Sequence, residues 1–182
     1  MRSIGFLVDT SLCIGCQSCR VGCQVTNATG ADTNWRTVSR HLEGVFPVLE
    51  QLDVSLACNH CADPACMQIC PIDAISKRDE DGIVIIDTDH CNGCMRCVSA
   101  CPYGAPRANP EKQEVSKCHF CYDRQDQGLP PACVETCVGG ALQFGPLDSF
   151  EERAGGRTLL RQVEGFFDPA YTNPSTRFLT RD

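Results

Sequence analysis

The chain has 182 residues, sixteen of them cysteines, and a formal net charge of −7 at pH 7. Without the cysteines, roughly a third of the residues are hydrophobic, which is little for a conventional core. The acidic balance and the lack of a Lys/Arg cluster argue against nucleic acid as a partner. No apolar run is long enough for a direct membrane span, and the first ten residues predict that the chain has no signal peptide of its own.

Short predicted strands and hairpins separate four groups of four cysteines. An apolar strand over residues 6–8 leads into group I, and another over residues 54–56 leads into group II. Two hairpins follow: one over residues 71–87 joins group II to group III, and one around Pro110-Glu111 joins group III to group IV. The groups are I (Cys13, Cys16, Cys19, Cys23), II (Cys58, Cys61, Cys66, Cys70), III (Cys91, Cys94, Cys97, Cys101) and IV (Cys118, Cys121, Cys133, Cys137).

The C-terminal part contains a strand, a short helix and an irregular tail. A strand is expected over residues 141–144, and Ser149 with Glu152 matches a capping box that opens a helix. The tail from Phe166 to Asp182 contains aromatic residues without a regular period. We expect this tail to lie against a partner protein rather than to fray.

The cysteine spacing favours cubane iron–sulfur clusters. Groups I and III read C-x2-C-x2-C-x3-C, the run that holds [4Fe-4S] clusters in bacterial ferredoxins, and its fourth cysteine ligates the neighbouring cluster. Disulfides suit exported scaffolds, and three cysteines within seven residues cannot pair locally without strain. Zinc prefers two C-x2-C knuckles and fits group IV alone. His60 and His119 lie inside C-x2-C loops, but four cysteines per group leave no ligand missing.

An internal repeat indicates which groups share clusters. Groups I and III each follow an apolar strand and Asp-Thr, whereas groups II and IV each end in a Pro-Ala-Cys stretch. Groups II and III are joined by a hairpin, as in a two-cluster ferredoxin, so groups IV and I form the second unit in reversed chain order. Pairing in chain order, I with II and III with IV, is the alternative. The expected sets are Cys13/Cys16/Cys19/Cys137, Cys118/Cys121/Cys133/Cys23, Cys58/Cys61/Cys66/Cys101 and Cys91/Cys94/Cys97/Cys70.

The repeat predicts an α+β fold of two ferredoxin-like units of the bacterial 2[4Fe-4S] type, one inserted into a circularly permuted other. The outer unit comprises residues 1–50 and 108–150, and the inserted unit comprises residues 51–107. Residues 151–182 form a C-terminal extension that we expect to contact a partner. No catalytic triad, paired carboxylates or nucleotide-binding motif stands out, so a non-catalytic role is expected.

Several motifs resemble the four-cluster iron–sulfur subunits of dimethyl sulfoxide reductase-type molybdenum enzymes, with the subunit of dimethyl sulfoxide reductase itself the most similar. They are GFLVDTSLCIGCQSC, CNHCADPAC, CPYGAP, KCHFCYDR and ALQFGPLD. The resemblance implies a nested arrangement of four [4Fe-4S] clusters. It also implies a large molybdopterin-containing catalytic partner and, in many relatives, a membrane anchor subunit linked to quinone.

The resulting hypothesis is an electron-transfer subunit that relays electrons between a molybdopterin catalytic subunit and a quinone-linked or soluble redox partner. A free-standing polyferredoxin-type carrier is the alternative. Relatives are often exported folded on a signal carried by the catalytic partner. The expected location is therefore at the membrane through partners, on the outer face of the cytoplasmic membrane or in the cytoplasm.

Overall fold

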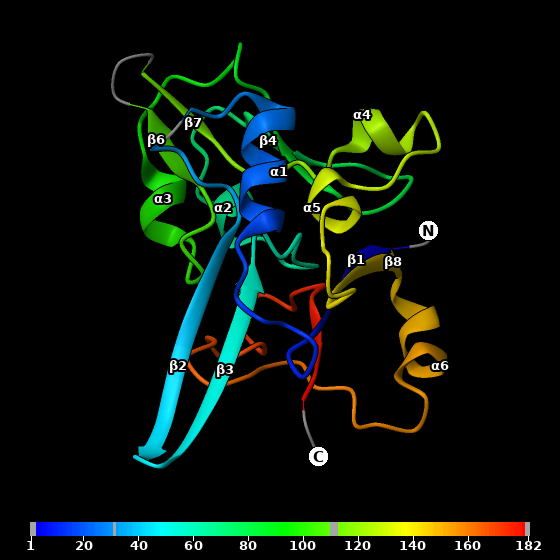
Figure 1. The fold of residues 1–182 in the computed structure, drawn as a ribbon. Helices are drawn as coiled ribbons and strands as arrows, with labels where there is room; N and C mark the ends of the chain where they lie inside the picture. Colours follow the sequence, from blue (N-terminus) through cyan, green and yellow to red (C-terminus); the bar gives the residue numbers. More distant parts are fainter. Residues whose placement is uncertain (1–2, 31, 110–112, 181–182) are drawn as a thin grey trace.

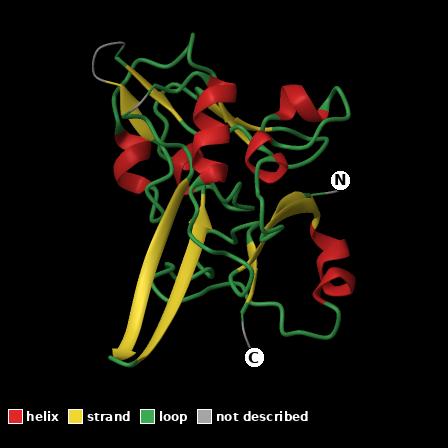
Figure 2. Ribbon diagram, in the orientation of Figure 1, coloured by secondary structure: helices red, strands yellow, loops and turns green. Residues whose placement is uncertain are grey.

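The structure, a computed structural model, describes residues 3–30, 32–109 and 113–180 (Figure 1). Its helices are short and most of the chain is loop, as Figure 2 shows. The strands are β1 (Ile4–Asp9), β2 (Thr37–Val45), β3 (Val48–Leu56), β4 (Ile75–Lys77), β5 (Val84–Ile86), β6 (Arg107–Asn109), β7 (Glu114–Ser116), β8 (Leu142–Pro146) and β9 (Arg177–Leu179). The helices are α1 (Ser18–Asn27), α2 (Ala65–Gln68), α3 (Arg96–Ala100), α4 (Tyr122–Gln125), α5 (Ala132–Glu135) and α6 (Phe150–Ala154), with a 3₁₀ turn, η1 (Leu147–Ser149), before α6.

A three-stranded sheet joins the two ends of the chain. Its order is β8-β1-β9, with β8 antiparallel to β1 and β9 parallel to it. Phe6 lies opposite Phe144, so the pairing between residues 6–8 and 141–144 that the repeat predicts is confirmed. The parallel strand β9 was not expected, because the tail shows no alternation of apolar and polar residues.

The two expected hairpins are present around groups II, III and IV. β4 pairs with β5, and β6 pairs with β7, both antiparallel. The turn expected at Pro110-Glu111 lies outside the described residues. Short helices and two-stranded hairpins agree with a ferredoxin-like α+β fold, while the nesting of one unit inside a permuted other stays a prediction.

A long hairpin of β2 and β3 extends away from the rest of the molecule (Figure 1). The sequence indicated only its last segment, over residues 54–56. The missing part shows no period-two pattern because both faces of the outer hairpin are largely exposed. The tip carries the exposed apolar residues Val45, Phe46 and Val48, each more than 70% exposed.

Two pairs of helices pack together, α1 with α5 and α2 with α3. Gly22 permits the first pair to approach closely, since a Cβ atom there would lie 2.5 Å from the Thr136 hydroxyl oxygen. The first pair comes from residues 1–50 and 108–150, and the second from residues 51–107. The helix packing therefore follows the expected division into units, which stays a prediction.

The prediction of a capping box at Ser149 is wrong, although the expected helix is present. The Ser149 hydroxyl donates a hydrogen bond back to the Pro146 carbonyl (2.7 Å) and makes no cap bond to α6. The reason is η1, which continues directly into the helix and leaves Ser149 in a helical conformation.

Much of the C-terminal tail packs on this chain itself. Thr172, Thr176 and Phe178 are each at most 2% exposed. Phe167 and Tyr171 are 43% and 74% exposed, so they are the aromatic residues available for the predicted partner contact.

No helix in the described ranges is both long and apolar enough to traverse a lipid bilayer.

Candidate metal centres

The sixteen cysteines surround four separate hollows, and all sixteen are free thiols. The empty volumes of these hollows range from about 250 to 410 Å³. A larger hollow of about 980 Å³ has no cysteine in its lining, so the thiols are not simply spread over every cavity. Site 1 is lined by Cys13, Cys16, Cys19 and Cys137, site 2 by Cys23, Cys118, Cys121 and Cys133, site 3 by Cys58, Cys61, Cys66 and Cys101, and site 4 by Cys70, Cys91, Cys94 and Cys97.

Left-handed residues bend the chain around each hollow. In groups I and III the residues Gly15, Gln17, Gly93 and Met95 occupy equivalent positions, and all four have positive φ. A side chain at Gly93 would overlap the backbone carbonyl of Gln113, so only glycine suits this approach.

Groups II and IV share a different loop conformation. His60 and Phe120 each lie two residues after the first cysteine of their group, and both have positive φ. The backbone therefore repeats with the same I/III and II/IV alternation as the sequence.

Each packed helix pair divides its cysteines between two sites. In the first pair, Cys19 of α1 lines site 1 and Cys23 of α1 lines site 2. Cys133 of α5 lines site 2, and Cys137, just after α5, lines site 1. Crossing the pair in this way brings cysteines more than 100 residues apart in sequence to one hollow.

The second helix pair is arranged in the same way. Cys66 in α2 lines site 3 and Cys70 after it lines site 4, while Cys97 in α3 lines site 4 and Cys101 after it lines site 3. Each hollow thus gathers the four cysteines of one set of the nested pairing, whose role as cluster ligands stays a prediction.

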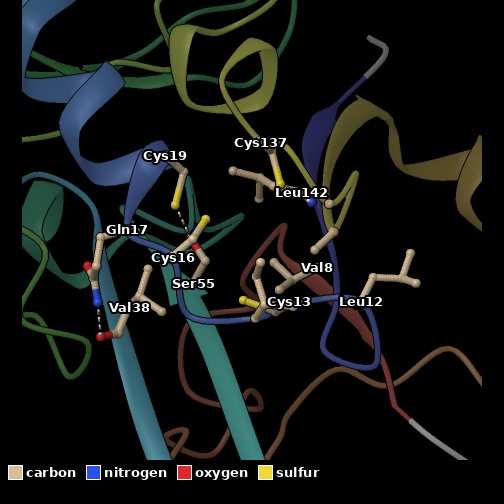
Figure 3. Close-up of a pocket in the computed structure, with 13 residues that line it drawn as sticks. Val8, Leu12, Cys13, Cys16, Gln17, Cys19, Val38, Ser55, Cys137 and Leu142 are labelled. Atoms are coloured by element: carbon tan, nitrogen blue, oxygen red, sulfur yellow. Dashed lines mark hydrogen bonds between the residues drawn. The ribbon is translucent and has the colours of Figure 1, made fainter.

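Site 1 lies between the first loop, α1 and the base of the β2–β3 hairpin (Figure 3). The Cys19 thiol hydrogen-bonds with the Ser55 hydroxyl of β3 at 3.3 Å, and the Gln17 side-chain amide donates to the Val38 carbonyl of β2 at 3.4 Å. The hairpin therefore forms one wall of the site. Cys16, at the mouth, is exposed.

Burial raises the pKa of several thiols in these sites. It raises the pKa of Cys23 and of Cys66 to about 12 and that of Cys61 to about 11, and neighbouring thiols contribute in each case. Cys16 differs, because hydrogen bonding with Ser18 lowers its pKa. Without metal these three thiols are protonated at neutral pH, so metal binding to them must release protons.

Polar hydrogens point at many of the sulfur atoms. The backbone amides of Ala105, Phe120 and Leu142 donate to the thiols of Cys101, Cys118 and Cys137 at 3.4–3.5 Å. The Asn27 side chain lies 3.6 Å from the Cys23 sulfur and 3.9 Å from the Cys121 sulfur. Hydrogen bonds of this kind stabilise charge on sulfur and adjust reduction potentials in iron–sulfur proteins.

The donor set of each hollow fits a [4Fe-4S] cluster, which takes four cysteine thiolates. Each hollow has four thiols, and apolar side chains such as Val8, Ile75 and Val84 contribute to the linings. Within residues 3–30, 32–109 and 113–180, no three His, Cys, Asp or Glu side chains converge closely enough to hold a single metal ion. Cluster ligation by these cysteines stays a prediction.

Direct contacts place the four sites in a row. Arg36, which lines site 2, donates a hydrogen bond to the Ser55 hydroxyl (3.1 Å). The same hydroxyl contacts the Cys19 thiol of site 1, so Ser55 connects sites 1 and 2. The rings of His60 and Phe120, from the loops of sites 3 and 2, lie 5.1 Å apart. Cys66 of site 3 and Cys97 of site 4 belong to one buried apolar cluster. Successive contacts therefore connect site 1 to site 2, site 2 to site 3, and site 3 to site 4.

The two exposed cysteines lie at opposite ends of this row. Cys16 belongs to site 1 and Cys94 to site 4. All four thiols of site 2 are buried, and site 3 has two buried thiols and two of intermediate exposure. The row therefore reaches the surface most openly at its two ends.

Sequence reasoning missed residues that contribute to the sites without being cysteines. Arg36 and Ser55 line sites 2 and 1, and Thr172 lines site 3 with its hydroxyl 2.9 Å from that of Tyr103. No local motif marks them. The only signal is indirect: Arg36 and Ser55 stand at the start and end of a segment that contains no cysteine and lies between two cysteine groups.

Comparisons with known proteins agree with this geometry. The family model of the 4Fe-4S dicluster domain matches residues 50–147, which include groups II to IV. One of the chains of anaerobic dimethyl sulfoxide reductase from Escherichia coli is 41% identical over 159 residues, covering 83% of this chain and 77% of that one. A tetrathionate reductase subunit from Salmonella typhimurium is 45% identical (86% and 62% covered), and the formate dehydrogenase-O iron–sulfur subunit from E. coli is 35% identical (93% and 63% covered).

Proposed function

Since this protein belongs to the 4Fe-4S dicluster family of iron–sulfur subunits, which includes the matching chain of anaerobic dimethyl sulfoxide reductase, we propose that it is a four-cluster electron-transfer subunit. One observation carries the proposal: four hollows in a row, each lined by four cysteines. When bound, [4Fe-4S] clusters supply one-electron redox chemistry at each site.

The residues of the chain hold, insulate and connect these centres. The four cysteines of each site are the proposed ligands, and the apolar linings exclude water from the sulfurs. Exposed Cys16 and Cys94 mark the two ends at which electrons enter or leave. Sites 2 and 3, which have no exposed cysteine, lie between the ends, so the chain itself spans the distance between two external redox partners.

The proposed partner at one end is a large molybdopterin-containing catalytic subunit. The names of the relatives support a partner subunit in general, because each relative is one component of a reductase or a dehydrogenase, and one is named as its iron–sulfur subunit. A membrane anchor subunit or a soluble redox protein is the proposed partner at the other end, which would hold this chain at the membrane through its partners. The chain itself is proposed to be non-catalytic.

The experiment is anaerobic purification of the tagged chain from its natural host, followed by iron analysis and identification of co-purifying proteins. We expect about 16 iron atoms per chain, bleaching by dithionite and a much larger co-purifying chain. A protein with little iron contradicts the cluster proposal. Full iron content in a stable monomer that captures no large chain favours the free-standing polyferredoxin-type carrier instead.

A further inference from the structure

Arg36 is a buried cation that has no carboxylate partner in the part of the chain that the structure describes. The residue immediately precedes β2 and is 1% exposed. Its guanidinium lies over the Phe6 ring, 4.4 Å from the ring centroid. None of the ion pairs found among the described residues involves Arg36. Removing a cation from water without a compensating charge is costly, so some other group must balance it.

The hydrogen-bonding capacity of this guanidinium is mostly unused by ordinary partners. Nη1 donates to the Ser55 hydroxyl at 3.1 Å, whereas Nε and Nη2 are buried without a hydrogen-bond partner among the described residues. Buried N–H groups on a charged side chain are rarely left unsatisfied in proteins. Arg36 lines the hollow of site 2. The guanidinium that carries the unpaired Nε and Nη2 donors therefore lies beside the four buried thiols of site 2.

The groups that most strongly influence the guanidinium of Arg36 are cysteine thiols. Although burial alone lowers the pKa of Arg36, the nearby thiols raise it overall. The strongest effects come from Cys133 and Cys118, followed by Cys19 and Cys23. Three of these four belong to site 2, and only Cys19 belongs to site 1. Most of the groups that act on Arg36 therefore belong to site 2, whose hollow Arg36 also lines.

We propose that Arg36 is the fixed counter-cation of site 2 and raises the reduction potential of the iron–sulfur centre held by Cys23, Cys118, Cys121 and Cys133. Reduction adds one negative charge to this centre, and a positive charge beside it favours the reduced form. In a buried, weakly screened environment this effect is larger than at the surface. The inference rests on the proposed function, because it requires a cluster in site 2.

The test is a redox titration of the intact, cluster-loaded protein followed by electron paramagnetic resonance. Arg36→Gln removes the charge at similar length, and Arg36→Lys keeps the charge but alters the hydrogen bonding. Cys121→Ser changes the same site and identifies its redox transition. We expect Arg36→Gln to lower that one midpoint potential by at least 59 mV, a tenfold change in a one-electron equilibrium. In Arg36→Gln the midpoint potentials of sites 1, 3 and 4 should stay close to those of the wild type. In Arg36→Lys all four midpoint potentials should do so.

Arg124 provides a matched control. It lies in α4, three residues after Cys121, but its guanidinium pairs with Glu135 at 2.5 Å and is partly exposed. We expect Arg124→Gln to leave all four potentials nearly unchanged, because solvent and Glu135 already screen this charge. An equal shift in Arg124→Gln and Arg36→Gln would overturn the proposal.

The remaining outcomes also decide the question. Arg36→Gln could lose the site 2 signal altogether. In that case, an Arg36→Lys variant that keeps its iron and its site 2 potential supports the role of the charge. An Arg36→Lys variant that also loses the site 2 signal overturns the proposal. Full iron content with an unshifted potential in Arg36→Gln, or a shift in a transition that Cys121→Ser does not affect, also overturns it. Wild-type protein without four redox transitions contradicts the proposed function instead.

Discussion

Cys19 and Cys23 lie one turn apart on α1 and yet line different hollows, sites 1 and 2. The second hollow is otherwise formed by cysteines from residues 118–133. A residue in the first cysteine group is therefore a proposed ligand for a site that consists mainly of the last group. This crossing is the sharpest residue-level consequence of the nested pairing.

We predict that Cys23→Ser damages the site 2 cluster and leaves the clusters of sites 3 and 4 intact. The reason is that Cys23 lines site 2 alone. The measurements are iron per chain and the electron paramagnetic resonance spectrum of the reduced protein. Cys16→Ser is the matched variant, because it changes the same sequence group but should affect site 1. Loss of a site 3 or site 4 signal in Cys23→Ser would favour pairing in chain order.

A buried ion pair ties the start of the chain to the segment after α6. Asp9 is 4% exposed, and Arg157 binds both of its carboxylate oxygens, with Nη2 3.1 Å from Oδ1. Burial alone raises the pKa of Asp9, but hydrogen bonds from Arg157 and Ser11 outweigh it and lower the pKa below its usual value. The ionised carboxylate is thus favoured by folding.

We predict that Arg157→Gln lowers the stability of the folded protein by about 1–2 kcal/mol at pH 7, because the buried Asp9 carboxylate then keeps only its hydrogen bonds from Ser11, while the partly exposed position of Arg157 weakens the lost ion pair. A carboxyl whose pKa is depressed on folding contributes stability above its unfolded pKa and loses it as the pH falls through the folded value. The difference in melting temperature between wild type and variant should therefore be constant from neutral pH to about pH 5 and shrink below about pH 4. A difference that grows on acidification would contradict this assignment.

At the level of single residues, the cysteines were predictable and their neighbours were not. The spacing of Cys91, Cys94 and Cys97 carries its own chemistry, because few sites need three thiols within seven residues. Arg36 and Thr172 reach the sites only through the tertiary fold, from segments with no motif. Their roles depend on burial, which the sequence around them does not reveal.

The β2–β3 hairpin is the element with the least obvious role within this chain. Its tip is apolar and exposed, with Val45 82% and Phe46 83% exposed. Its base contributes Val38 and Ser55 to site 1. A partner chain seated on this hairpin would therefore lie beside the site of exposed Cys16.

We predict that the double variant Val45→Asp/Phe46→Asp reduces co-purification of the proposed catalytic subunit by about tenfold or more and leaves iron per chain unchanged. Charges at the tip oppose the burial of an apolar interface but lie outside every cysteine site. Leu129→Asp is the control, because Leu129 is an exposed apolar residue in a different loop, at 43% exposure. If both variants recover the large chain equally well, the hairpin tip is not part of the interface.

The close packing of α1 on α5 depends on Gly22. A side chain at this position would overlap the side chain of Thr136, whose hydroxyl donates to the Ser18 carbonyl at 3.3 Å. We predict that Gly22→Val costs about 1–3 kcal/mol by overpacking and lowers iron in sites 1 and 2. Thermal unfolding and iron analysis measure both effects. Val21→Leu adds bulk on the exposed side of the same helix and should be neutral.

Elements were predictable where the chain repeats itself. The pairing of β1 with β8 followed from the likeness of two cysteine groups, and the β4–β5 hairpin followed from a charged turn between apolar runs. The outer β2–β3 hairpin and β9 lack such a pattern, because the first is exposed on both faces and the second adds only three residues to the edge of a sheet. The capping box failed because η1 precedes α6 and satisfies the Ser149 hydroxyl locally.

At the scale of the whole molecule, the two largest buried apolar clusters both include cysteines of the sites. The largest buried cluster includes Cys19, Cys58, Cys118 and Cys133 among its members, and a second cluster includes Cys66 and Cys97. The helices that carry these cysteines are short, four or five residues except for α1. Short helices and a thin apolar core contribute little stability alone, so bound metal is expected to supply much of the folding free energy.

We predict that removal of the iron unfolds the chain. Trp35 is the only tryptophan and lines site 2, where its indole donates to the Ser116 hydroxyl at 3.1 Å and its ring contacts His119 edge-on. Anaerobic chelation should therefore abolish the near-UV circular dichroism and shift Trp35 emission to the wavelength of the denatured protein. A mock-treated sample without chelator should keep both signals. An iron-free chain with native near-UV circular dichroism and protected Trp35 emission would show that protein contacts alone maintain the four hollows.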